Sequence, residues 1–134
     1  MVVNMKIGIT GSRDFKNLQK IDEKLDEILK WFEDKEPESD SDFEPLTIIT
    51  GGARGVDQQA MAWCLRKAFA HNVEQITIRP INPKDKYSYL FRNVEIVTMS
   101  DHIIAFWNGT SRGTKFTMDY ANERGKKVLV IRDD

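Results

Sequence analysis

Cysteine and histidine are scarce in this sequence of 134 residues, which contains one cysteine and two histidines. A disulfide within the chain is therefore excluded, and neither His71 nor His102 has partners at a spacing typical of metal ligands. We expect no metal site and no cofactor. Cys64 falls within an amphipathic helical pattern, so we interpret it as a small buried hydrophobe, which suits a reducing, cytoplasmic compartment.

Long apolar runs are also missing. No segment approaches the roughly 20 apolar residues of a membrane-spanning helix, and the first residues lack the pattern of a signal peptide. We therefore expect a soluble, unprocessed protein with no membrane partner. The length fits a single domain, residues 1–134, that can bury a core without disulfides or metal.

Charge of one sign is not in excess overall, but it is unevenly distributed. Residues 33–44 contain seven acids and one lysine, a net charge of −6, so the remainder of the chain carries +5 of the total of −1. This composition predicts an acidic, flexible insertion within the fold at about residues 34–45. A positive excess of this size disfavours a general DNA-binding face.

Apolar segments alternate between strand-like and helix-like patterns. The predicted strands are 5–10, 46–50, 75–79, 102–107 and 128–131, and the predicted helices are 17–33, 56–70, one ending near residue 100, and 114–124. Asn17 or Asp14 is a candidate N-cap of the first helix, and Gly125 follows the last helix as its C′ residue. The alternation predicts an α/β, Rossmann-like, three-layer fold with a five-stranded parallel sheet.

Glycine-rich turns that each carry an arginine follow the first, second and fourth predicted strands. Ligands of open parallel sheets bind at the carboxyl ends of the strands, where glycine allows a phosphate to approach the backbone. One anion-binding cleft built from the three turns requires the strand order 3-2-1-4-5. The candidate ligand-binding residues are Gly11, Ser12, Arg13, Gly51, Gly52, Arg54, Gly55, Asp57, Arg92, Asn93, Asn108, Gly109, Ser111, Gly113 and Thr114.

Several of these side chains have more than one interpretation. The N–H groups of the first turn face a phosphate, or the turn is an ordinary strand-to-helix connection. Asp57 binds a ribose hydroxyl, or it interacts with the positive end of its own helix. Tyr89 and its aromatic neighbours stack on a base, or they cover the edge of the sheet. Trp107 is a core residue at the end of its strand, or it stacks on the ligand.

The segments Thr10–Arg13, Thr50–Asp57 (TGGARGVD), Arg92-Asn93 and Gly113-Thr114 form a recognisable series. The chain resembles the SLOG superfamily, which includes the SMF/DprA DNA-processing proteins and the LOG cytokinin-activating enzymes, and is most similar to its small stand-alone YspA-type branch. The resemblance covers nearly the whole chain. It implies a Rossmann-like domain that binds nucleotides or nucleotide-derived ligands in the predicted cleft.

The fourth-strand turn departs from the LOG motif Pro-Gly-Gly-x-Gly-Thr-x-x-Glu, because Thr117 takes the place of the glutamate. Threonine cannot replace a carboxylate in glycosidic cleavage, and Asp119 lies on another side of the helix. Catalytic residues therefore stay unassigned. The leading hypothesis is binding of a nucleotide or nucleotide-derived metabolite; the alternatives are a LOG-related nucleotide hydrolase and, less favoured, single-stranded nucleic-acid binding. The apolar helix faces permit self-association.

Overall fold

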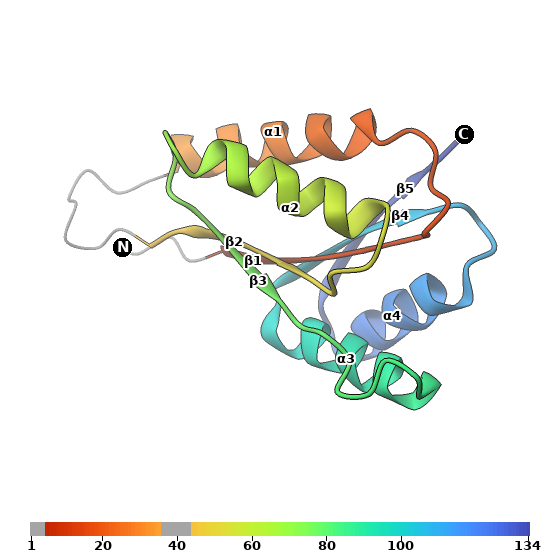
Figure 1. Ribbon diagram of the computed structural model, residues 1–134. Helices are drawn as coiled ribbons and strands as arrows, with labels where there is room; N and C mark the ends of the chain where they lie inside the picture. The colour runs from red at the N-terminus through yellow and green to blue at the C-terminus, as the bar shows by residue number, and fades with distance from the viewer. Residues whose placement is uncertain (1–4, 36–43) are drawn as a thin grey trace.

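The computed structural model describes residues 5–35 and 44–134. The elements, in chain order, are β1 (Met5–Gly11), α1 (Gln19–Asp34), β2 (Leu46–Thr50), α2 (Val56–Lys67), β3 (Val73–Thr77), α3 (Lys86–Met99), β4 (His102–Trp107), α4 (Arg112–Glu123) and β5 (Lys127–Arg132). The five strands are all parallel and ordered β3-β2-β1-β4-β5. Helices α1 and α2 cover one face of the sheet, and α3 and α4 cover the other (Figure 1). The predicted fold class and strand order are confirmed.

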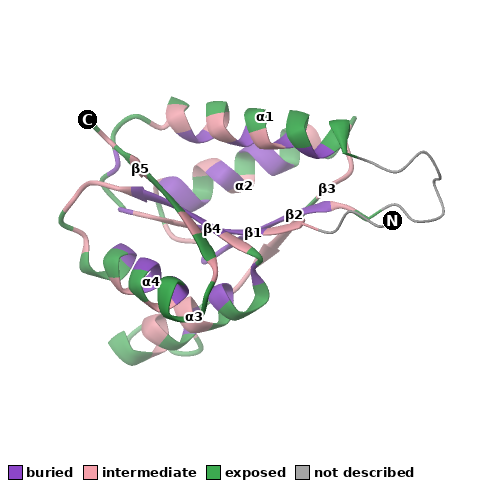
Figure 2. Cartoon of the chain, turned by 180° about the vertical axis from the view of Figure 1, so that it is seen from behind, coloured by how far each residue is buried: buried purple, intermediate pink, exposed green. Residues whose placement is uncertain are grey.

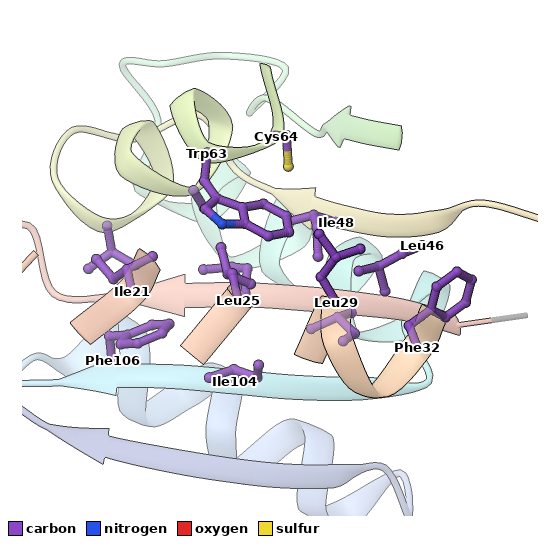
Figure 3. Packing of buried hydrophobic residues seen from close by; sticks show 14 of the residues in the cluster. Ile21, Leu25, Leu29, Phe32, Leu46, Ile48, Trp63, Cys64, Ile104 and Phe106 are labelled. Carbon is purple, nitrogen blue, oxygen red and sulfur yellow. The ribbon is translucent and has the colours of Figure 1, made fainter. Parts of the chain in front are cut away.

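The spacing of apolar residues explains how α1 lies on the sheet. Ile21, Leu25, Leu29 and Phe32 recur every three or four residues and form one buried stripe. This stripe packs in the same cluster as sheet residues such as Ile104 (Figure 3). Burial of each such side chain stabilises the fold by roughly 1.5 to 3 kcal/mol, so the sequence pattern determines which face of α1 meets the sheet.

Helix α2 completes this layer through two adjacent residues. Trp63 is fully buried, and its indole Nε1 donates a hydrogen bond to Asp26 Oδ1 of α1 at 2.8 Å. Cys64 is buried beside it, as predicted, and burial raises the pKa of its thiol to about 12. Such a thiol stays protonated at neutral pH and is a packing group.

The second face of the sheet has a smaller core. Ile96 and Val97 of α3 and Ala121 of α4 pack with Ile49 and Ile103 of the central strands. Figure 2 shows buried residues along the inner sides of the helices and exposed residues along their outer sides. Both helices are thereby held with their N-termini near the carboxyl ends of the strands, as parallel β-α units require.

Several element boundaries differ from the sequence prediction, and two of the differences have a clear structural reason. Strand β3 begins at Val73, two residues early, because its ladder with β2 pairs Val73 with Leu46 and Thr77 with Thr50. Helix α4 begins at Arg112 because the side chain of Ser111 is its N-cap, accepting a hydrogen bond from the Thr114 N–H.

The helix ends give two corrections and one confirmation. The predicted side-chain cap of α1 by Asn17 or Asp14 is wrong, since Leu18 stands at the N-cap and makes no side-chain bond to the helix. Gly125 follows α4 with φ of +75° and is the predicted C′ glycine. Helix α2 ends at Lys67, short of the predicted residue 70.

The predicted acidic insertion lies largely outside the described residues, which omit 36–43. Within the described ranges, no helix is both long and apolar enough to cross a membrane.

Candidate functional site

A cavity of about 450 Å³ lies at the carboxyl ends of β1 and β4. These neighbouring strands are the switch point of the sheet, because the chain adds β2 and β3 on one side of β1 and β4 and β5 on the other. The walls of the cavity come from the turns after β1, β2 and β4, from α3 and from the start of α4. The predicted site residues that line it are Gly11, Arg13, Asp57, Arg92, Asn93, Asn108, Ser111, Gly113 and Thr114. The structure therefore brings all three predicted turns to one cavity, as expected at a topological switch point.

The remaining predicted residues lie outside the cavity lining. Gly52 has φ of +72°, and a Cβ there would lie 2.7 to 3.0 Å from side-chain atoms of Arg79 and Thr77. Arg54 is exposed in the same turn and is not part of the lining. Gly109 lines a separate hollow beside α4, together with Trp107, and Ser12, Gly51 and Gly55 have structural contacts described below.

Ser12 and Asn108 join the first and fourth turns. The Ser12 N–H donates to the Phe106 carbonyl at 3.0 Å, and the Ser12 Oγ accepts from the Asn108 N–H at 3.0 Å. The Asn108 side chain donates to Asp14 Oδ1 at 2.7 Å and accepts from the N–H groups of Thr110 and Ser111. The Ser12 N–H is therefore already bonded at the carboxyl ends of β1 and β4 and is not free to donate to a phosphate.

Asp57 organises the second turn from the first helical residues of α2. Its Oδ2 accepts hydrogen bonds from the N–H groups of Gly51 and Ala53, both at 3.1 Å. Burial raises the pKa of Asp57 to about 6, although these two N–H groups and the charges of Arg92 and Arg13 act in the opposite direction. A carboxylate with these contacts stabilises the turn and also borders the cavity.

Two arginines approach the ring of Tyr89. The guanidinium of Arg92 lies 5.4 Å from the ring centroid and that of Arg13 lies 5.9 Å from it, both within cation–π range. Arg92 is buried, and it donates from Nη1 to the Gly51 carbonyl at 2.7 Å and from Nε to Asn93 Oδ1 at 2.8 Å. Arg13 is exposed and forms no hydrogen bond or ion pair within the described residues.

Tyr89 thus contacts cations of the site, a role that the sequence analysis did not consider. Its hydroxyl donates to the Pro83 carbonyl at 2.9 Å, which fixes the ring. The aromatic residues of 87–91 signalled a ring near the cleft, but the pairing with two arginines from different elements has no signature in the sequence.

The glycines around the cavity have different structural reasons. A Cβ at Gly11 would lie 2.4 Å from a methyl carbon of buried Val56, so this glycine allows β1 and α2 to approach closely. Gly55 has φ of +82°, and a Cβ there would lie 2.8 Å from the Arg13 carbonyl oxygen. A Cβ at Gly113 would have no atom within 4 Å, so the side-chain direction of this residue is open space at the cavity wall.

The N-terminus of α4 has free donors at the edge of this cavity, which Gly113 lines and Arg112 does not. The N–H groups of Arg112 and Gly113, the first two of the helix, have no acceptor in the described part of the chain. Such groups favour an anion. Thr117, in the place of the LOG glutamate, is buried and donates from Oγ1 to the Gly113 carbonyl at 3.0 Å.

Asp119 and Trp107 lie away from this cavity. Asp119 is paired with Lys115 at 2.7 Å and lines the hollow beside α4. Trp107 donates from its indole to the Ser111 carbonyl at 3.0 Å, while Arg132 covers its ring at 5.4 Å. The indole therefore supports the fourth turn. Within the ranges 5–35 and 44–134, no three histidine, cysteine or acidic side chains gather as metal ligands would.

Solved structures share this architecture. The X-ray structure of DNA processing protein A (DprA) from Streptococcus pneumoniae superposes with a TM-score of 0.68 and 18% sequence identity, over 94% of this chain and 50% of that chain. The domain has a DprA-like fold. A second DprA, from Helicobacter pylori, whose structure concerns its single-stranded DNA binding mode, matches with a TM-score of 0.60 and 20% identity over 94% of this chain and 64% of its own.

The DprA comparison confirms the SLOG resemblance at the level of the fold. This chain spans about half to two thirds of the DprA chains that it matches. No protein-family model and no curated protein matches the sequence.

Proposed function

We propose that the domain binds a nucleotide or nucleotide-derived metabolite in the cavity at the ends of β1 and β4. The observation that carries this proposal is that Arg13, Arg92 and the N–H group of Gly113, which has no acceptor among the described residues, meet in one cavity. Guanidinium groups and helix N-termini are both typical phosphate ligands. A cavity of about 450 Å³ lies within the size range of small-molecule sites.

Arg13 offers the sharpest test, because removing its side chain breaks no hydrogen bond or ion pair among the described residues. We expect Arg13→Ala to weaken binding of adenosine monophosphate about ten- to a hundredfold, measured by titration calorimetry. Arg54→Ala is the matched control, since it removes an exposed arginine of the neighbouring turn outside the cavity. Equal affinities of Arg13→Ala and the unaltered protein would contradict the proposal.

Single-stranded DNA binding is the second candidate, and two exposed aromatic residues favour it. Tyr87 is 58% exposed and Phe91 is 69% exposed, and they lie one turn apart on α3, outside the lining of the cavity. Exposed aromatic rings are typical stacking platforms for unpaired bases, and the H. pylori DprA structure concerns single-stranded DNA. Binding of a fluorescent oligothymidylate that weakens steeply with salt and is lost in Phe91→Ala would support this candidate over a free nucleotide.

The hydrolase alternative has weaker support from the geometry. Thr117 stands where the LOG motif has glutamate, and Asp119 is outside the cavity. Asp57, just after the second turn, contributes a carboxylate to the cavity, and its Oδ2 accepts two hydrogen bonds from the backbone of that turn. Release of free base from nucleoside monophosphates, abolished in Asp57→Asn, would favour hydrolysis.

A further inference from the structure

Asp57 presents an oxygen to the cavity that the fold does not use. The residue is 7% exposed, and Oδ2 accepts both hydrogen bonds that hold the second turn. Oδ1 accepts no hydrogen bond from the described residues, and no described side-chain oxygen is both sealed from solvent and without a partner. Because Asp57 also lines the cavity, Oδ1 opens onto it.

No cation neutralises this oxygen directly. No ion pair joins Asp57 to an arginine or lysine within the described residues, although Arg92 and Arg13 act on it from a longer distance. A buried carboxylate oxygen with a vacant position is costly unless a donor occupies it. A ligand of this cavity therefore satisfies Asp57 best by offering a hydrogen-bond donor.

The position of the phosphate ligands decides which donor this is. Arg13 and Arg92 line the same cavity as Asp57 and are close enough to influence its charge. In a nucleotide the ribose is joined directly to the phosphate, so its hydroxyls reach a carboxylate beside the phosphate site, whereas the donors of the base lie farther along the molecule.

We propose that Asp57 accepts a hydrogen bond from a ribose hydroxyl through Oδ1, so that the hydroxylated ribose is part of what the site recognises. This inference rests on the proposed nucleotide binding. It makes Asp57 a residue with two separate functions, in which Oδ2 holds the turn and Oδ1 selects the sugar. It also predicts ribonucleotides as ligands, in contrast to DNA.

The experiment compares three probes on the whole chain by titration calorimetry: adenosine monophosphate, its 2′-deoxy form and its 3′-deoxy form. A charge-assisted hydrogen bond predicts that at least one deoxy form binds about ten- to a hundredfold more weakly. In Asp57→Asn this ratio should fall to a few-fold. The ratio is the readout, because loss of the negative charge strengthens phosphate binding of all three probes alike.

Asp119→Asn is the control, since Asp119 is an acid outside this cavity and is paired with Lys115 at 2.7 Å. It should leave the ratio unchanged. Equal binding of the three probes to the unaltered protein would overturn the role of Asp57 while leaving nucleotide binding intact, and this comparison does not depend on any variant folding. Absence of binding by all three would instead contradict the proposed function itself.

Discussion

Gly113 and Gly11 line the same cavity but should respond in opposite ways to an added methyl group. Gly113 is an exposed residue in the first turn of α4, and a Cβ there would meet no atom within 4 Å. Alanine is more favourable than glycine in a helix, because glycine loses more backbone entropy on folding. Gly113→Ala should therefore stabilise the unliganded protein and place a methyl group at the cavity wall.

The structure gives the size of both effects. The helix preference is worth roughly 0.5 to 1 kcal/mol, which raises Tm by about 2 to 5 °C for a domain of this length. The same methyl group would obstruct a phosphate at the Gly113 N–H, and loss of a charge-assisted hydrogen bond weakens binding about ten- to a hundredfold. Gly11→Ala differs, because its Cβ would lie 2.4 to 2.6 Å from the three side-chain carbons of Val56. Overpacking of this kind costs about 1 to 3 kcal/mol.

Differential scanning calorimetry with and without adenosine monophosphate measures both quantities. Gly113→Ala should have a higher Tm than the unaltered protein in the absence of ligand and a smaller increase on ligand addition. Gly11→Ala should have a lower Tm in both conditions. Destabilisation by Gly113→Ala, or an undiminished response to ligand, would refute the assignment of Gly113 to the phosphate wall.

Three further outcomes follow from the described contacts. The folded state raises the pKa of Asp57 from 3.8 to about 6, so folding favours the neutral form of this side chain. The resulting stability is present below about pH 4 and is lost as the pH rises to about 6. The free energies of unfolding in urea of the unaltered protein and of Asp57→Asn should therefore diverge by about 3 kcal/mol over this pH range, and parallel plots of the two free energies against pH would refute the burial of Asp57 as the cause. Gly55→Ala should cost at least 1 kcal/mol in chemical unfolding, because φ is +82° and the Arg13 carbonyl is adjacent; a neutral effect would show that the turn can rearrange. Replacing residues 36–43 by a Gly/Ser linker should leave nucleotide affinity unchanged, since the described residues that line the cavity come from 9–14, 53–57, 89–96 and 108–114. A loss of affinity measured by calorimetry would assign residues 36–43 a function.

The strand order could be predicted because alternating strand and helix patterns constrain parallel sheets strongly, and the three turns required one shared edge. The position of β3 could not, since Val73, Ile76 and Ile78 do not alternate strictly with the polar residues of 73–79, so the pattern does not mark where the strand begins. Only the ladder to β2 decides this.

The candidate site, too, could be predicted only in part from the sequence. Glycine and arginine after three strands predicted where the cavity lies, but the occupation of each donor depends on contacts across the fold. Ser12 bonds to Phe106 and Arg92 bonds to Gly51, residues 94 and 41 positions away in the chain. No local pattern reveals that these groups are already satisfied, so sequence reasoning overestimated the number of free N–H groups in the first turn.

The hydrogen bonds among Ser12, Asp14 and Asn108 separate the positions around the cavity into two classes that would evolve differently. A substitution at any of these three disturbs two turns at once, so such changes are tolerated only in combination. Among the described residues, no such hydrogen bond ties the side chain of Arg13 or the position of Gly113 to a second turn, so each can be substituted singly. A library confined to these two positions could therefore change which anion the domain accepts while its scaffold stays intact, and related domains could have diverged in ligand by the same route.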